Sequence, residues 1–278
     1  MTKDAPTRAT KLKPTLFARG QVSTGNGVSF APDARTVYTA SPVADPDAPA
    51  DYGHKRMTIF QQTLTGDTWS PPSVAPFSGK FNDYEAFVTQ DGRRIYFMSS
   101  RPKPGTDTNW ISQDIWYVER AADNQWSDAV HVPEASSDTY DGYPEVASDD
   151  TLYFASDRDG TKGSVDLWRI RYTDGKPGPL ENLAALNTPD WESDPCLAPD
   201  GSFIIFYRAP VEAGYRGCDL YIAYREADSF AAPVPLTRVN TLDGEIGPCI
   251  TPDGRALIFQ SGPRLVQVDL AAAIEGTR

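Results

Sequence analysis

The sequence predicts an all-β fold, a five-bladed β-propeller of four-stranded antiparallel blades. The first observation is compositional: 24 Pro and 21 Gly among 278 residues interrupt short apolar runs, which is typical of many turns between strands. The second is a repeat, because five segments align on a turn that reads Pro-Asp-Gly or a variant. The third is the spacing of 58, 58, 51 and 53 residues between successive turns, enough for four strands each. The anchoring aspartates are Asp33, Asp91, Asp149, Asp200 and Asp253.

Each repeat starts with a strand, turns at its aspartate and returns through a strand rich in β-branched and aromatic residues, as in "EAFVTQDGRRIYFMS" from Glu85. A third strand is expected in "QDIWYVER", "VDLWRIRY" and "CDLYIAYRE". A fourth is expected after "TWSPPSVAPF", "QWSDAVHVP" and "FAAPVPLTRV". Four antiparallel strands per repeat make one propeller blade.

The last repeat stops after its third strand, "PRLVQVDL", so it lacks a fourth. The segment from Pro14 matches the segment from Pro233, where a fourth strand leads into the next first strand. We therefore expect the N-terminal strand to complete the last blade, which leaves no free edge around the ring. Residues 1–12 are expected to form a flexible arm and residues 13–278 a single propeller domain, with a short helical turn in "DLAAAIEG".

These repeats resemble the TolB-type, WD40-like (PD40) repeats, whose cores read roughly P-x-x-S-P-D-G-x-x-I-Y-F-x-S-x-R followed by D-I-W. The resemblance covers nearly the whole chain, although blade one has Ala34 in place of the glycine and no D-I-W before "RMTIFQQT". It implies the propeller fold. It implies little about activity, because propellers of this group include translocation scaffolds, polysaccharide lyases and peptidase companions. The lyases use a histidine-rich metal centre, which has no counterpart in a chain whose only histidines are His54 and His131.

Composition narrows the partners. The net charge of -12 argues against a nucleic-acid partner and favours a cationic or neutral small-molecule or glycan ligand. No apolar run is long enough for membrane insertion. The start of the chain has no apolar signal core, so a cytoplasmic location is expected, or a periplasmic one if a signal has been removed. Three cysteines without a CxxC motif support neither a disulfide framework nor a zinc site. No cofactor is expected, although repeated acids could bind a divalent cation.

Acids recur in the loop that leads into the first strand in four of the five blades, on the face where propeller function usually lies, and Gly25 holds the position in blade one. We call them the loop acids: Asp83, Asp141, Glu192 and Glu245. One interpretation is a ring of carboxylates that binds a cation or a polar ligand. The other is that each caps N–H groups in its own blade.

Other acids break the repeat and are more informative. Glu85 and Asp194 occupy a position that is Gly27, Tyr143 or Gly247 in the other blades. Glu145 occupies a second position, which elsewhere is Ser29, Phe87, Cys196 or Cys249. A repeated scaffold gives no reason for these charges, whereas glycoside hydrolysis uses two carboxylates, one of them with a raised pKa. The candidate catalytic residues are Glu85, Asp141, Glu145 and Asp194; a solvated acidic rim is the alternative.

Arginines and aromatic residues fall in the same loops. Arg101, Arg158 and Arg208 could bridge to the loop acids or bind a carboxylate of the ligand. Aromatic rings beside carboxylates suit a sugar or another cyclic polyol. The candidate substrate-binding residues are Asp83, Tyr84, Arg101, Trp110, Tyr143, Arg158, Trp191, Glu192, Arg208 and Glu245.

We therefore expect an acidic funnel that binds a carbohydrate or a similar polar small molecule, and the leading hypothesis adds its hydrolysis by glycoside-hydrolase-like acid–base chemistry. The alternative is a non-enzymatic, TolB-like scaffold that holds another protein. Such a scaffold would expose an apolar patch of several hundred square ångströms.

Overall fold

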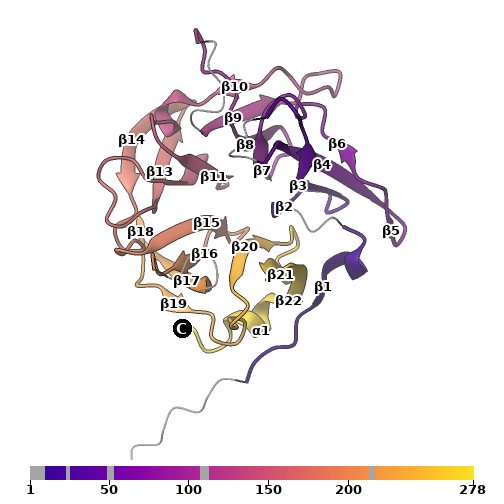
Figure 1. Cartoon of the computed structure of the whole chain (residues 1–278). Helices are drawn as coiled ribbons and strands as arrows, with labels where there is room; N and C mark the ends of the chain where they lie inside the picture. Colours follow the sequence, from indigo (N-terminus) through magenta and orange to yellow (C-terminus); the bar gives the residue numbers. More distant parts are fainter. Residues whose placement is uncertain (1–9, 23–25, 49–52, 107–112, 213–216) are drawn as a thin grey trace, which may run out of the picture.

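The computed structural model describes residues 10–22, 26–48, 53–106, 113–212 and 217–278. Five antiparallel sheets stand as blades around a central axis, in sequence order (Figure 1). Within each blade the first strand lies innermost, and the chain moves outward strand by strand. The predicted five-bladed propeller is confirmed.

The strands of each blade are as follows. Blade one contains β2 (Asn26–Phe30), β3 (Thr36–Ala44), β4 (Lys55–Thr65), β5 (Thr68–Trp69) and β6 (Ser73–Val74). Blade two contains β7 (Asp83–Val88), β8 (Arg94–Ser99), β9 (Asp114–Glu119) and β10 (Val130–His131), followed by the 3-10 turn η3 (Pro133–Ala135). Blade three contains β11 (Asp141–Val146), β12 (Thr151–Ser156), β13 (Asp166–Thr173) and β14 (Lys176–Asn182). Blade four contains β15 (Trp191–Leu197), β16 (Phe203–Ala209), β17 (Asp219–Glu226), β18 (Ser229–Phe230) and β19 (Val234–Pro235).

Blade five is closed by the N-terminal segment, as the sequence predicts. It contains β20 (Glu245–Ile250), β21 (Ala256–Ser261) and β22 (Arg264–Asp269), and β1 (Thr15–Leu16) is its fourth strand. β1 pairs antiparallel with β22, Thr15 opposite Gln267 (Figure 1). The expected helical turn is α1 (Leu270–Ile274), capped by Asp269, whose side chain accepts a hydrogen bond from the Ala272 N–H.

The expected N-terminal arm is only partly described. Residues 1–9 lie outside the described residues. The Leu12 N–H donates to the carbonyl of Arg238 at 2.8 Å, and the Leu12 side chain packs against the cluster between blades four and five. The last residues of the arm therefore lie against the propeller.

The hairpin turns are structural. In every blade the anchoring aspartate accepts a hydrogen bond from the N–H two residues further along, at 2.8 to 3.1 Å. Such Asx turns hold the chain between the first and second strands. Buried β-branched and aromatic side chains of adjacent blades then form the core between them, for example Ile59 of blade one with Ile95 and Phe97 of blade two.

Each first strand carries a β-bulge. The pairing with the second strand shifts by one residue at the same place in all five blades. The extra residue has a left-handed backbone, with φ between 51° and 63°. These residues are Gly27, Glu85, Tyr143, Asp194 and Gly247, and we call them the bulge ring.

No helix in the described ranges is long and apolar enough to cross a membrane.

Closure of the ring depends on Phe17, which follows β1 and is 7% exposed among Val28, Ile258 and Leu265. Phe17→Ala should lower the free energy of unfolding by about 3–5 kcal/mol, because it leaves a cavity between blades one and five. Urea denaturation checks this. Leu16→Ala is the matched control, since Leu16 is 50% exposed and should cost less than about 1 kcal/mol. Equal losses for the two variants would contradict the role of Phe17.

Candidate functional site

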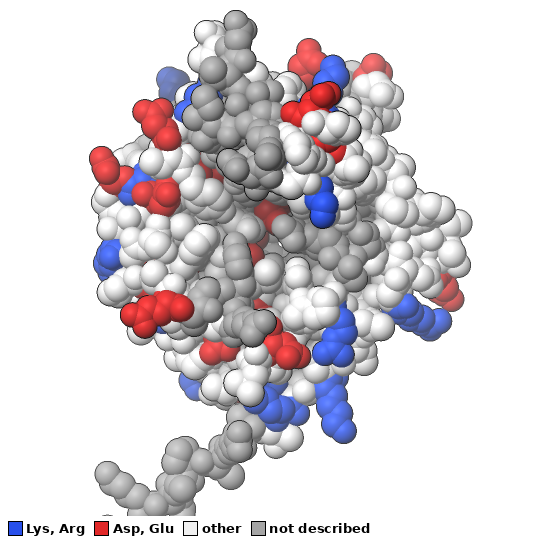
Figure 2. All heavy atoms as spheres, viewed as in Figure 1, with Lys and Arg blue, Asp and Glu red and all other residues white. Residues whose placement is uncertain are grey.

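The bulge ring forms the waist of a central channel. All five of its residues line two cavities, one on either side. The cavity beyond the bulge is about 350 Å³ and extends to the residues just before the hairpin turns. The other, about 390 Å³, is bounded by Asp243, Gly244, Ile246, Gln260 and Gly262. Figure 2 shows the hollow at the centre of the propeller, with acidic side chains inside it.

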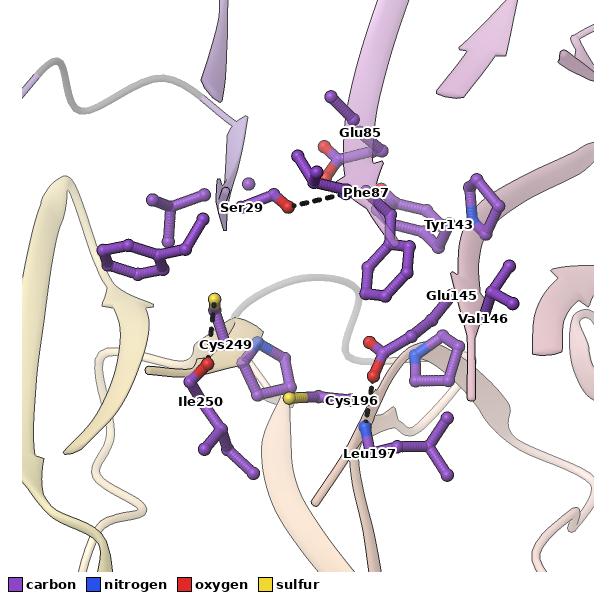
Figure 3. A pocket seen from close by; sticks show the side chains of 18 of the residues that line it. Ser29, Glu85, Phe87, Tyr143, Glu145, Val146, Cys196, Leu197, Cys249 and Ile250 are labelled. Atoms are coloured by element: carbon purple, nitrogen blue, oxygen red, sulfur yellow. Dashed lines mark hydrogen bonds between the residues drawn. The ribbon is translucent and has the colours of Figure 1, made fainter. Parts of the chain in front are cut away.

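A second ring lies two residues further along each first strand and lines the 350 Å³ cavity (Figure 3). It consists of Ser29, Phe87, Glu145, Cys196 and Cys249. Glu145 and Phe87 point into this cavity from neighbouring blades (Figure 3). The two positions at which acids break the repeat therefore both face the channel.

The bulge ring holds three side chains in an unfavourable backbone conformation. Glycine tolerates positive φ freely, but a non-glycine residue there costs about 1–2 kcal/mol. Blades one and five use glycine. Blades two, three and four place Glu85, Tyr143 and Asp194 there, with φ of 51°, 52° and 54°. Residues that keep strain of this kind are concentrated at functional sites.

Glu85 and Asp194 interact electrostatically across the channel. Burial raises the pKa of Glu85, and the negative charge of Asp194 raises it further. Burial also raises the pKa of Asp194, although the neighbouring Ser193 hydroxyl and the hydrogen bond from the Gly247 N–H oppose this. The pair therefore retains a proton at a higher pH than two separate carboxylates would.

Both acids fit against glycines of the bulge ring. A Cβ atom at Gly27 would lie 2.1 Å from Glu85 Oε2, so a larger residue at position 27 would displace that carboxylate. The Gly247 N–H donates to Asp194 Oδ2 at 3.0 Å. Asp194 is 7% exposed, and its Oδ1 has no hydrogen-bond partner within the described ranges. That oxygen is the acceptor that the fold leaves unsatisfied at the waist.

Glu145 has a different environment. Burial raises its pKa to about 8, and its Oε1 accepts the Leu197 N–H at 2.5 Å. The Ser29 hydroxyl, at the equivalent position in blade one, accepts the Val88 N–H in the same way at 3.1 Å. Both side chains satisfy an amide on the inner edge of the next blade's first strand, an edge with no further strand to pair with.

Tyr143, Cys196 and Cys249 are protonated at neutral pH. Burial raises the pKa of all three, and nearby carboxylates raise it further. A cysteine nucleophile requires a thiolate, so neither thiol is activated here. None of the three cysteines forms a disulfide within the described residues.

The loop acids, by contrast, do not reach the channel. Asp83, Asp141, Glu192 and Glu245 are fully buried and line neither cavity. Each accepts hydrogen bonds from a hydroxyl in its own approach loop: Ser78, Ser137, Thr188 and Thr241 respectively. Asp141 therefore leaves the set of candidate catalytic residues, because its carboxylate is enclosed within blade three.

The arginines pair with these acids. Arg101 binds Asp83 at 2.9 Å, Arg158 binds Asp141 at 2.5 Å, and Arg208 binds Glu192 at 2.6 Å. Each guanidinium also lies against aromatic rings of its own blade: Phe97 and Trp116, Phe154 and Trp168, and Phe206 and Tyr221. In blade five Ser261, at the position of Ser99 and Ser156 in blades two and three, donates to Glu245. None of the three arginines lines either cavity.

The expected aromatic platforms are mostly absent from the channel. Of Tyr84, Tyr143 and Trp191, only Tyr143 lines the cavities. Tyr84 accepts a hydrogen bond from Gln113, and Trp191 packs in the core between blades. Trp110, like Tyr215 in the corresponding loop of blade four, lies outside the described residues.

The rim on the hairpin-turn side was not predicted from the sequence. Pro32, Gln90, Pro199 and Pro252 line the 350 Å³ cavity, and Gln90 Nε2 donates to the Pro199 carbonyl at 3.1 Å, linking blades two and four. Their shared position in the repeat could have identified them, because each directly precedes an anchoring aspartate. They were not considered because function was predicted on the opposite face.

The described residues contain no group of three or more His, Cys, Asp or Glu arranged to hold a metal ion. The chemistry available in the channel is that of carboxyl groups, a phenol and aromatic rings. Carboxyl and phenol groups are able to form hydrogen bonds with a polar ligand and to donate or accept protons.

No family model matches the chain, and no curated protein matches it in sequence. Its structure is similar to an α-L-arabinofuranosidase from Lactobacillus brevis (12% identity, TM-score 0.56, 89% of this chain and 90% of that chain). It is also similar to a gluconolactonase from Xanthomonas campestris (13%, 0.51, 88% and 85%) and to a chain of a nidogen/laminin complex (12%, 0.53, 89% and 76%). At such identities the likeness shows the propeller fold, and the TolB-type resemblance remains a resemblance.

The buried arginine pairs should stabilise the blades. Arg158→Met removes the partner of Asp141, which is fully buried, and should lower the free energy of unfolding by roughly 3–5 kcal/mol. Chemical denaturation measures the loss. Arg171→Met is the matched control, because the Arg171–Asp228 pair is exposed and contributes less than about 1 kcal/mol. A loss at Arg158 no larger than at Arg171 would contradict a structural role.

Glu145 should make stability depend on pH. Its pKa is about 8 in the folded chain, against the ordinary value of 4.5, so the folded state binds the proton more tightly. The resulting stabilisation is complete below pH 4.5 and is lost as the pH rises towards 8. Glu145→Gln keeps an acceptor for Leu197 but cannot ionise. The melting temperature of the variant relative to the parent should therefore rise between pH 5 and 9, by roughly 4 °C or more.

Asp159→Asn, at an exposed position in the loop after β12, controls for the loss of one negative charge. A constant difference in melting temperature between Glu145→Gln and the parent across this pH range would show that Glu145 does not titrate as described.

Proposed function

We propose that the central cavity binds a small carbohydrate or similar polyol and hydrolyses it with Glu85 and Asp194 as the acid–base pair. One observation carries the proposal. Two carboxyl groups, those of Glu85 and Asp194, occupy strained, equivalent positions in blades two and four and face the same cavity. The pKa of each is raised. Packing alone gives no reason to keep two acids where glycine is the unstrained choice.

The proposed chemistry needs one proton and one carboxylate. Near neutral pH the Glu85–Asp194 pair holds a proton that two solvated carboxyl groups would have lost. The protonated member donates to the leaving-group oxygen as the glycosidic bond breaks. The ionised member takes a proton from the attacking water or attacks the sugar itself, depending on the separation of the two groups.

Other residues of the cavity would orient the ligand. The Tyr143 phenol and the protonated Glu145 carboxyl can each donate a hydrogen bond to a ring hydroxyl. Phe30 and Phe87 offer apolar faces for the sugar ring. A cavity of about 350 Å³ is at the small end of the roughly 300–1,000 Å³ range of ligand pockets, which favours one or two rings over a long polymer.

The similar α-L-arabinofuranosidase is in agreement with this proposal, although the likeness extends only to the fold. The scaffold alternative has less support. Among the described residues, most exposed large apolar side chains are spread over the outer strands of separate blades, as Leu16, Val74, Val130 and Leu180 are. This distribution provides single contacts around the circumference and no concentrated docking face.

A panel of 4-nitrophenyl glycosides tests the proposal. Glu85→Gln and Asp194→Asn should each lower kcat/KM for the best substrate by about 10²- to 10⁴-fold, because each removes one partner of the acid–base pair. Asp159→Asn, far from the cavity in an exposed loop, should leave turnover unchanged. Absence of turnover of every glycoside by the parent chain, or full turnover by both variants, would contradict the hydrolytic function.

Two alanine variants of the bulge ring add a geometric control. Gly27→Ala and Gly247→Ala carry the same backbone strain, since both glycines have positive φ. Only the Cβ at position 27 collides with Glu85, because at position 247 the nearest side-chain atom is 3.9 Å away. Gly27→Ala should therefore lose more kcat/KM than Gly247→Ala, and the reverse order would argue against Glu85.

A further inference from the structure

The cavities have acidic but no basic side chains among their described lining residues. Glu85, Glu145 and Asp194 line the larger cavity, and Asp243 lies at the smaller one, whereas no Lys, Arg or His lines either. The arginines nearest in sequence are held by the loop acids. A ligand with negative charge would meet uncompensated repulsion here.

The backbone of the channel also offers few hydrogen-bond donors. First strands at the centre of a propeller have inner N–H groups that could bind an anion, but side chains already occupy three of them. Ser29 accepts the Val88 N–H, Glu145 accepts the Leu197 N–H, and Asp194 accepts the Gly247 N–H. These three N–H groups are therefore not available to a ligand.

One acceptor lacks any partner in the described structure. Asp194 is more than nine-tenths buried, lines both cavities, and has a free Oδ1. A buried carboxylate oxygen without a hydrogen bond is costly, so a donor in the channel would recover that energy. An ammonium group supplies both the donor and the compensating charge.

Aromatic faces complete the site. Phe30, Phe87 and Tyr143, from blades one, two and three, line the larger cavity, and Phe87 projects into it (Figure 3). A cation beside such a ring is attracted to its face, most strongly where water is excluded. Carboxyl groups and aromatic rings that line the same cavity favour an organic cation over a neutral polyol.

We propose that the ligand carries a protonated amine on a small ring, as an amino sugar does, and that Asp194 and Glu85 bind the ammonium group. This inference rests on the proposed function, because it specifies the ligand of the same cavity. The amine is recognised by charge and by the free Asp194 oxygen. The ring lies towards the aromatic side chains, and the cavity volume restricts it to a small molecule.

Matched sugars test this inference by isothermal titration calorimetry on the full chain. The probes are glucosamine, galactosamine and mannosamine, each compared with its neutral hexose and its N-acetyl derivative, and tetramethylammonium chloride compared with sodium chloride at equal ionic strength. At least one amine should bind about tenfold or more tightly than its hexose, and N-acetylation should abolish the advantage because it removes the charge. Equal or weaker binding of every amine would overturn the inference.

Two variants show whether the named residues are responsible. Asp194→Asn and Glu85→Gln should each reduce the amine advantage at least threefold while hexose binding changes less. Circular dichroism and melting temperature establish that each variant is folded. If Asp194→Asn does not fold, Glu85→Gln alone decides. An undiminished amine advantage in a folded variant would overturn the assignment.

The outcomes separate this inference from the proposed function. If neutral hexoses bind and glycosides are hydrolysed while the amines show no advantage, the cation inference is wrong and the proposed function stands. If no probe binds and no glycoside is hydrolysed, both are wrong.

Discussion

The β-bulge in every first strand is the constraint on which the channel depends. In a regular strand alternate residues point to the same face, and a first strand would place them against the neighbouring blades. The extra left-handed residue changes that direction and places one residue per blade at the axis, with a side chain in blades two, three and four. Both cavities, the meeting of Glu85 with Asp194 and the need for glycine at position 27 follow from this one irregularity.

A second device keeps positive charge out of the channel. Three blades bury an arginine between a loop acid and aromatic rings. Each pair ties the approach loop to the body of its own blade, and it also confines the guanidinium at a distance from the axis. Glu85, Glu145 and Asp194 therefore have no cationic neighbour among the described residues that line the cavities. Burial raises the pKa of each of these carboxyl groups. The scaffold thus sets the charge of the site.

The sequence predicted the fold because the evidence for it is local and repeated. The spacing of the turns, the strand patterns and the missing last strand define the ring and its closure. Glu85, Asp194 and Glu145 could be singled out because they depart from the repeat, and the structure brings all three to the cavity. Asp141 was a candidate because it lies in a loop that leads into a first strand, on the face where propeller function usually lies, and the burial of its carboxylate beside Arg158 is not evident from the sequence. Gly27 and Gly247, aligned with Tyr143, were the available signal of positive φ.

A site made of one residue from each blade can change in small steps. Its five bulge positions share a backbone conformation but differ in the space beside them. A side chain at position 27 would displace the Glu85 carboxylate, whereas position 247 has space for a small side chain at the cost of backbone strain. A related chain could therefore acquire a new group at the second position without altering the groups contributed by the other blades. The repeated backbone stays constant, and substitution of single residues at the axis would change which ligands such a propeller binds.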